Sequence, residues 1–556
     1  MDFNHYYKND ELEQVLQDWA ARFPSLVTLE TIGQSYEKRP VWLLTVTNQQ
    51  SGEHINKPAM WLDANIHATE LAGTTAVLFI LNSLLEGYGK GERITRLLDG
   101  NVLYVVPRIN PDGAEQALSA SPRFIRSGVR PYPYPEQMPG LIEQDIDGDG
   151  RVLQMRIVDP SGDWKASATD PRLLEKRLPH EHGGTYYRLL TEGKIKDYDG
   201  FNIPVPPNIS GLDFNRNFPF QWRPENEQYG AGDFPASEPE IQAVTRFVAS
   251  HPNINVALTF HTYSRVLLRP YSTKPDDQMN FGDVTLFKRI GQIGTEITGY
   301  PNISTYHDFR FEPNEITYGA FDDWVYDQFG MVAFTIEQWD LADAAGIKKK
   351  SIMDWFKEHP IEDDLAILRW ADENIGPDAF IDWYAYQHPQ LGAVELGGWN
   401  MLTTWRNPPA HKLQAEVERH LPFVLALGEM LPKITLPLLD ARRLGENTWS
   451  VRAGVENTGY LAAFTTNQAR ARKAVRPARV VIELPEGARL VEGRAEIEIG
   501  FLEGRSNKFS FALDVAATDN RGLAIWLVEA APGTQIAVKV IAERAGTLVK
   551  TFRLGE

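Results

Sequence analysis

The spacing of apolar residues alternates between the period of helices and that of strands over residues 1–375. Apolar positions three and four apart predict amphipathic helices, and short apolar runs predict buried strands. We expect helices at residues 9–23, 238–250, 284–298 and 362–374, and strands at 27–32, 41–47, 102–106, 256–261 and 331–336. Strands that alternate with helices in this way predict an α/β domain with a mostly parallel or mixed sheet.

The stretch at residues 59–80 carries the strongest chemical signal. An apolar run at 60–62 leads into a short polar turn, and a long apolar helical pattern follows. The turn holds His67 and Glu70, three residues apart at the carboxyl end of the expected strand. Catalytic zinc sites commonly take three protein ligands from His and Glu and leave a fourth position for water. This pair therefore predicts a metal site that needs one more ligand.

Two further residues end apolar strands and complete this pattern. His261 ends the strand in TFHTYS, and Glu337 ends the strand in FTIEQWD. A lone histidine there would more often be structural, but ligands in open α/β sheets gather at the carboxyl ends of strands. We therefore expect His261 beside His67 and Glu70. Glu337 is either paired with an arginine or poised as a base, with a pKa raised by burial.

A polar turn, GLDFNRNFP at residues 211–219, offers groups that recognise an anion. Arg216 beside Asn215 can hold a carboxylate, because a guanidinium presents two parallel donors. Taken alone, Arg216 would be read as a surface residue. Asp213 is expected to accept a hydrogen bond from a metal-bound imidazole and so to orient it.

Residues 114–210 are rich in Pro and Gly and poorly periodic, which marks a long insertion that is functional or built around small elements of its own. Within it, Asp145, Asp147 and Asp149 alternate with other residues in DIDGDGRV. They resemble the first half of a calcium loop, whose twelfth position is normally Glu but is Arg156 here. A calcium site and a solvated acidic turn both remain open.

The character of the chain changes after residue 375. We expect a connecting helical segment over residues 376–432, with a helix at 413–431 that Pro432 ends. From residue 433 onward, short alternating strands such as 449–455 are separated by Gly, Asn and Asp. This pattern predicts an all-β sandwich module over residues 433–556, following a catalytic domain over residues 1–375.

Composition narrows the function classes. A chain of 556 residues exceeds the usual size of one domain. The net charge of −18 argues against nucleic-acid binding, and the absence of cysteine excludes disulfides and thiolate metal sites. No uninterrupted apolar run is long enough for a membrane span, and the N-terminal residues show no signal peptide. We therefore expect a cytoplasmic location; the oligomeric state stays open.

Five motifs in one order resemble the zinc carboxypeptidase family, the metallocarboxypeptidases of the carboxypeptidase A type. They are HATE at 67–70, NPDG at 110–113, LDFNRN at 212–217, FHTYSRVLLRPY at 260–271, and DDWVYDQFG with FTIE at 322–337. Each motif alone is weak, but their shared order is specific. The resemblance implies an α/β/α sandwich with a mixed eight-stranded sheet.

The resemblance also implies roles for individual residues. His67, Glu70 and His261 would be the zinc ligands, and Glu337 would be the base that activates water. The Asn-Arg pair of the third motif would hold the C-terminal carboxylate of a peptide substrate.

The rim of the implied site follows the family pattern less closely. The family uses an arginine to polarise the scissile carbonyl, and that arginine follows an apolar pair. Arg156 in LQMRI has a similar setting and is our first candidate; Arg126 and then Arg130 are the alternatives. Tyr318 would be the tyrosine that covers the substrate, although its loop is short. Asp322 lies where members that cleave basic C-terminal residues carry Asp, which favours Lys or Arg. Its alternative role is to interact with a helix dipole.

These features predict a zinc-dependent carboxypeptidase that hydrolyses the C-terminal bond of peptides or proteins. A second hypothesis keeps the zinc but assigns cell-wall peptides or N-acyl amino acids as substrates. A third is a non-catalytic binding protein that works through its β-module, which the complete set of ligands and base disfavours. The expected partner is a peptide with a free C-terminal carboxylate, with neither nucleic acid nor membrane involved.

Overall fold

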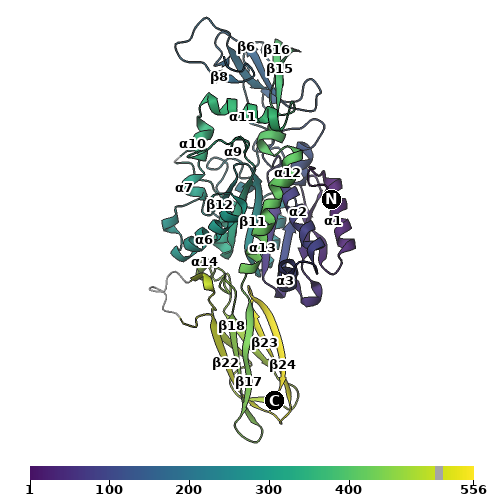
Figure 1. Cartoon of the computed structure of the whole chain (residues 1–556), viewed down its shortest axis with the longest axis vertical. Helices are drawn as coiled ribbons and strands as arrows, with labels where there is room; N and C mark the ends of the chain where they lie inside the picture. The colour runs from purple at the N-terminus through teal and green to yellow at the C-terminus, as the bar shows by residue number, and fades with distance from the viewer. Residues whose placement is uncertain (313, 508–516, 556) are drawn as a thin grey trace.

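The computed structural model describes residues 1–312, 314–507 and 517–555. The chain forms a row of three parts, with a small sheet at one end, a central α/β body and an all-β part at the other end (Figure 1). The central sheet has eight strands in the order β1-β2-β4-β3-β11-β14-β12-β13 and contains parallel and antiparallel pairs. The predicted α/β fold with a mixed eight-stranded sheet is confirmed.

The strands at the middle of this sheet are buried along their whole length. Every residue of β3, β11 and β14 is buried, as expected for parallel strands covered on both faces. The strands of the sheet are β1 (Val27–Gln34), β2 (Pro40–Val46), β3 (Ala59–Ala64), β4 (Val102–Val106), β11 (Ile254–Thr262), β12 (Val266–Arg269), β13 (Asn302–Ser304) and β14 (Val332–Gln338).

Amphipathic helices pack on the sheet and enclose one large hydrophobic core. Helices α1 and α5 contact β1, α2 contacts β3 and β11, α6 contacts β12, and α8 contacts β14. The main helices are α1 (Asn9–Arg22), α2 (Ala72–Gly87), α3 (Glu92–Gly100), α4 (Pro111–Ala117), α5 (Pro239–Ser250), α6 (Phe281–Thr298), α8 (Phe321–Phe329), α10 (Ile352–Lys357) and α11 (Ile361–Asn374). Within the described residues, no helix is both long and apolar enough to span a membrane.

The long insertion forms most of a second sheet, in the order β15-β16-β6-β9-β7-β8. The insertion supplies β6 (Gln154–Val158), β7 (Trp164–Ala166), β8 (Leu174–Lys176) and β9 (Tyr187–Thr191), and a later part of the chain supplies β15 (Phe380–His388) and β16 (Gly392–Trp399). Strand β16 joins the two parts because it pairs with β6. We call this the cap sheet; it lies at the top of Figure 1.

The expectation of a helical segment throughout residues 376–432 is therefore wrong for its first half. The strands β15 and β16 come first, and their exposed and buried residues partly alternate, as a half-exposed hairpin requires. A short irregular helix, η5 (Met401–Arg406), follows, and then α12 (Ala410–Val417) and α13 (Leu421–Met430) return to the central body.

Two four-stranded sheets share one apolar core in the C-terminal part, as the sequence predicted for an all-β module. One contains β17 (Ile434–Arg443), β18 (Thr448–Asn457), β22 (Arg521–Glu529) and β20 (Arg489–Glu492), and the other contains β21 (Glu496–Gly500), β19 (Ala478–Glu483), β23 (Gln535–Ala542) and β24 (Gly546–Arg553).

This C-terminal part is joined to the central body by buried hydrogen bonds. The hydroxyl of Thr466 donates to the carbonyl of Gly330 at 2.7 Å, and the buried guanidinium of Arg544 donates to the same carbonyl at 3.3 Å. Gly330 precedes β14 and has a φ of 65°, and a Cβ atom there would lie 2.5 Å from that of Ala469. The junction is thus closely fitted.

The NPDG turn connects segments that later meet at the candidate site. Asn110 accepts a hydrogen bond from the backbone of Gly113 and donates one to the carbonyl of Ser127, both at 2.8 Å. Asp112 accepts hydrogen bonds from Ser35 and Arg39, both at 2.7 Å. The turn therefore fixes the segment near residue 127 beside the HATE turn.

We expect Gly113→Ala to destabilise the fold. Its Cβ atom would lie 2.4 Å from the Asn110 amide nitrogen, 2.7 Å from the Ala68 Cβ atom and 2.8 Å from the Ser127 carbonyl oxygen. Overpacking of this kind costs about 1–3 kcal/mol, measured by urea unfolding. Gly100→Ala is the matched control, because its Cβ would meet no atom within 4 Å. Equal stability of the two variants would contradict the prediction.

Candidate metal centre and substrate pocket

The turn after β3 brings two of the predicted ligands together. Asn65 has a left-handed backbone with φ of 56°, and its side-chain amide donates to the carbonyls of His67 at 2.7 Å and Glu70 at 3.2 Å. Helix α2 begins directly after the turn, at Ala72. The neighbouring strand β11 presents His261 at the same edge of the sheet. These local hydrogen bonds therefore fix the positions of His67 and Glu70 even without a bound ion.

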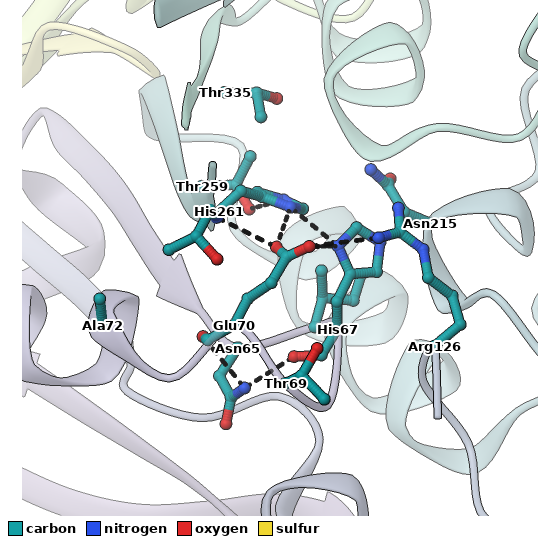
Figure 2. Close-up of polar contacts among 12 residues, drawn as sticks. Asn65, His67, Thr69, Glu70, Ala72, Arg126, Asn215, Thr259, His261 and Thr335 are labelled. Carbon is teal, nitrogen blue, oxygen red and sulfur yellow. Dashed lines mark hydrogen bonds and ion pairs between the residues drawn. The ribbon is translucent and has the colours of Figure 1, made fainter. Parts of the chain in front are cut away.

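The three side chains converge on one point, as Figure 2 shows. The Nδ1 atom of His67 lies 2.9 Å from one carboxylate oxygen of Glu70, and the Nδ1 atom of His261 lies 3.0 Å from the other. The two Nδ1 atoms are 3.1 Å apart. Ligand atoms about 2.0 Å from one tetrahedral ion would be about 3.3 Å apart, so this donor set fits zinc after small adjustments.

The other ring nitrogens of both histidines also have partners. The Nε2 atom of His67 lies 3.2 Å from Asp213, and the Nε2 atom of His261 lies 3.2 Å from the hydroxyl of Thr259. That hydroxyl donates to Asp63 at 2.6 Å. Such partners fix the ring orientation of metal-binding histidines. Asp213 was predicted; Thr259 was missed, although its position two residues before His261 placed it on the same face of the strand.

Glu337 lies beside this cluster because β14 pairs with β11 in register, with Glu337 opposite His261. Its side chain is buried, and within the described residues its Oε2 atom has no hydrogen-bond partner. Burial and the nearby charge of Glu70 raise the pKa of Glu337 to about 8. A cation bound by the cluster would lower this pKa again.

Arg126 is the arginine that reaches the cluster. Its Nε donates to Asp213 at 2.9 Å, and its Nη1 donates to Glu70 at 3.2 Å. Its own carbonyl accepts a hydrogen bond from Ala68, inside the HATE turn, at 2.9 Å. Although burial alone would raise the pKa of Asp213, the charge of Arg126 helps to hold it well below its usual range.

The structure does not place Arg156 at the cluster, which corrects our first choice of arginine. Arg156 lies on β6 of the cap sheet, where it donates to Glu395 at 2.8 Å and its guanidinium lies 4.4 Å from the ring centroid of Trp383. Its apolar neighbours belong to a strand that the sequence did not reveal. Arg130, the third candidate, donates to Glu238 at 2.7 Å instead.

A pocket of about 340 Å³ opens over the cluster, and the predicted anion-binding residues line it. The carbonyl of Asn215 accepts from the Arg216 guanidinium at 2.7 Å, and its side-chain oxygen accepts from the backbone of Phe321 at 2.8 Å. Asp322 also lines the pocket and is only 5% exposed. The Thr335 hydroxyl approaches it at 3.5 Å, and burial raises the pKa of Asp322.

Tyr318 does not line this pocket, contrary to its expected place above the substrate. Its ring lies under Arg223, with 4.9 Å between guanidinium and ring centroid. The next residue, Gly319, has a φ of 68° and packs against the backbone of Arg216, where a Cβ atom would lie 2.2 Å from the carbonyl oxygen. This packing places Tyr318 away from the pocket, although the loop residues Phe311, Glu315 and Thr317 line it. Among the described residues, Tyr263 is the tyrosine that lines the pocket.

Arg406 is a pocket residue that the sequence did not reveal. One guanidinium nitrogen lies 3.8 Å from Glu70, and the guanidinium lies 5.2 Å from the ring centroid of Tyr263. The next residue, Asn407, accepts hydrogen bonds from the backbone of residues 71–72 at 2.8 and 3.0 Å. It thereby fixes η5 to the start of α2. Only the tertiary structure brings this segment to the site, so no local motif indicated it.

The calcium prediction gains no support. Oxygens of Asp145, Asp147 and Asp149 lie within 4.8 Å of one another, but the group is largely exposed. Asp145 accepts from two backbone amides of its own loop, at 2.6 and 2.9 Å, and Asp147 accepts from the hydroxyl of Tyr384. These contacts are typical of an acidic turn, the second of the two hypotheses.

The fold and the two-histidine, one-glutamate cluster define a candidate zinc site at the carboxyl edge of a mixed α/β sheet. The family model described as zinc carboxypeptidase matches residues 12–351. The match covers more than half of the chain, and the chain belongs to this family. A second model, described as a domain of unknown function, matches residues 433–553.

Curated relatives carry carboxypeptidase names. The chain is 25% identical to carboxypeptidase B2 of Bos taurus, over 60% of this chain and 63% of the relative, so it spans less than two thirds of that protein. It is 25% identical to carboxypeptidase A2 of Rattus norvegicus, over 65% of this chain and 72% of the relative. The solved carboxypeptidase A from Helicoverpa armigera is 17% identical, with a TM-score of 0.40, over 67% of this chain and 76% of that one.

We expect the purified protein to bind one zinc ion per chain and His261→Ala to lose it, because only two protein ligands then remain. Asp213→Asn should weaken zinc binding about 10–100-fold through the loss of the partner of His67. His411→Ala, an exposed histidine elsewhere, is the control and should keep its zinc. Mass spectrometry of metal content after dialysis against a weak chelator measures all three. Full zinc content in His261→Ala would refute the ligand assignment.

Proposed function

We propose that this chain is a zinc-dependent carboxypeptidase that hydrolyses the C-terminal peptide bond of peptides or proteins. The observation that carries the proposal is one pocket lined by the His67–Glu70–His261 cluster, a buried carboxylate at Glu337 and the guanidinium of Arg216. These groups are a metal site, a base and an anchor for a terminal carboxylate. Family membership supports hydrolysis, and the free C-terminus follows from the anchor.

Glu337 is proposed as the general base. A zinc ion held by the cluster would lower the pKa of a bound water and add positive charge at the site. Within the described residues, one oxygen of Glu337 has no hydrogen-bond partner, and the pKa raised by burial makes its ionised carboxylate a stronger base, so it can accept the proton of that water. The same carboxyl then donates the proton to the leaving amine.

Arg126 is proposed to stabilise the negative charge that develops on the carbonyl oxygen. Its guanidinium is oriented by Asp213 and Glu70, and it lines the catalytic pocket. A charged donor already fixed in place favours the transition state without further reorganisation. Arg126 is therefore proposed for the carbonyl-polarising role that the sequence first assigned to Arg156.

Arg216 and Asn215 are proposed to bind the terminal carboxylate and thereby to restrict the enzyme to chain ends. Arg216 is 20% exposed at its side chain and lies 3.8 Å from Asp213, which leaves donors available to a substrate. A peptide whose terminus is amidated lacks the charge that this guanidinium recognises.

Asp322 is proposed to favour Lys or Arg as the residue removed. It lies in the same pocket as Arg216 and is almost fully buried. A buried carboxylate without a bound cation carries a desolvation cost, which the ammonium or guanidinium of a basic side chain offsets. Family membership alone does not imply this preference for basic C-terminal residues.

We expect the zinc-loaded protein to remove the last residue of peptides with a free C-terminus and to leave amidated peptides intact. Glu337→Gln should lower kcat by about 10³-fold or more while zinc stays bound, because the water then has no base. Mass spectrometry of the products and of metal content measures both. Cleavage only of cell-wall peptides or N-acyl amino acids would favour the second hypothesis, and full activity of Glu337→Gln would exclude Glu337 as the base.

We expect Asp322→Asn to lower kcat/KM for peptides that end in Lys or Arg by about 30–100-fold, since the buried partner of the cation is removed. Peptides that end in Leu or Phe should change little, and they serve as the internal control. Competition between two peptides in one reaction, read by mass, gives the ratio directly. An equal loss on both kinds of peptide would contradict a role of Asp322 in specificity.

A further inference from the structure

A second cavity borders the catalytic pocket, and the side chains of Tyr263 and Phe356 line both cavities. We call this second cavity, of about 320 Å³, the aromatic groove. The cap sheet forms one wall, and residues of α10 and α11 form the other. Its aromatic lining consists of Tyr263, Phe356, Trp164, Trp355, Phe380, Trp383, Trp399 and Trp405.

Apart from Tyr263, the groove's aromatic residues come from segments other than those that hold the metal ligands. Trp164 comes from the insertion, and Trp383, Trp399 and Trp405 come after residue 351, where the zinc carboxypeptidase match ends. The two segments meet where β16 pairs with β6. The groove is thus a feature of this chain's additional parts, placed directly beside the family's pocket.

Unused hydrogen-bond donors lie where the two cavities meet. Within the described part of the chain, the buried Nε1 atom of Trp405 has no hydrogen-bond partner. Its neighbour Arg406 lines the catalytic pocket and approaches Glu70 only at 3.8 Å. The Arg406 guanidinium is 31% exposed at its side chain, so the carbonyl groups of an extended peptide can accept hydrogen bonds from it.

The arrangement of the pocket assigns a direction to a bound peptide. Asn215 and Asp322 line the catalytic pocket and not the groove, so they define the end that takes the terminal residue. Tyr263 and Phe356 line both cavities and define the side on which the rest of the peptide leaves. An extended chain advances about 3.3–3.6 Å per residue, so a few residues upstream of the cleaved bond reach beyond this boundary.

We propose that the aromatic groove binds the upstream part of the peptide substrate and selects extended segments with aromatic or apolar side chains. The inference rests on the proposed carboxypeptidase function. Flat indole rings bury large apolar areas and stack with aromatic side chains. Arg406 donates to the peptide backbone at the entrance.

The test compares three substrates that share their last two residues. One is an N-acylated dipeptide that fills only the catalytic pocket, one is a hexapeptide with Phe and Trp upstream, and one is a hexapeptide with Gly and Ser upstream. For the wild-type protein we expect kcat/KM for the aromatic hexapeptide to exceed that for the other two about tenfold.

One variant removes part of the groove's aromatic surface. Trp164→Ala should lower kcat/KM for the aromatic hexapeptide about 5–10-fold and leave the dipeptide unchanged, which also shows that the variant is folded. Phe201→Ala is the matched control, an aromatic residue of the same insertion that is 86% exposed and outside the groove.

The outcomes separate this inference from the proposed function. Equal kcat/KM for the two hexapeptides, or equal losses on all three substrates in Trp164→Ala, would overturn the groove's role while the carboxypeptidase stands. If no substrate is cleaved, the proposed function fails. In that case, equilibrium binding of the hexapeptides to the zinc-loaded protein tests the groove by itself. Tighter binding of the aromatic hexapeptide that is lost in Trp164→Ala would support the groove's role. Tighter binding of an amino-sugar oligosaccharide would refute it.

Discussion

Two buried carboxylates, Glu70 and Glu337, lie at one edge of the central sheet, and the rest of the site must compensate their negative charge. Glu70 follows β3 and Glu337 lies near the end of β14. Burial and the charge of Glu70 raise the pKa of Glu337 to about 8. Buried charges of one sign require compensation. Arg126 and Arg406 supply part of it, and a cation held by the cluster would supply the rest. The site thus favours a bound positive charge even without a substrate.

The central body was predictable because its signals are local. The buried strands β3, β11 and β14 are mostly apolar, and each has polar residues at or just beyond its carboxyl end, which the topology brings to one edge. A short motif therefore indicated both the element and the chemistry of His67, His261 and Glu337. The C-terminal sheets were predictable for the same reason, since residues of β18 alternate between buried and less buried positions.

What the sequence did not reveal depends on contacts between distant segments. Arg156 has a local setting that suits the site, but β6 pairs with β16, which places it opposite Glu395 in the cap sheet. Arg406 has no motif, yet Asn407 fixes its segment to the start of α2 across more than 300 residues, at separations of 335 and 336. Tyr318 has the expected place in the family order, but its ring packs against Arg223 and does not line the pocket. These errors all depend on contacts between segments that are distant in the sequence, which carry no local pattern.

The junction at Gly330 bears on where the folded unit that holds the site ends. Thr466 and Arg544 donate hydrogen bonds to the carbonyl of Gly330, two residues before β14, and β14 carries Glu337. Removal of the C-terminal part would leave this carbonyl and the apolar surface around it exposed at the start of the strand that bears Glu337. The shortest chain that preserves the site therefore does not end where the family resemblance ends.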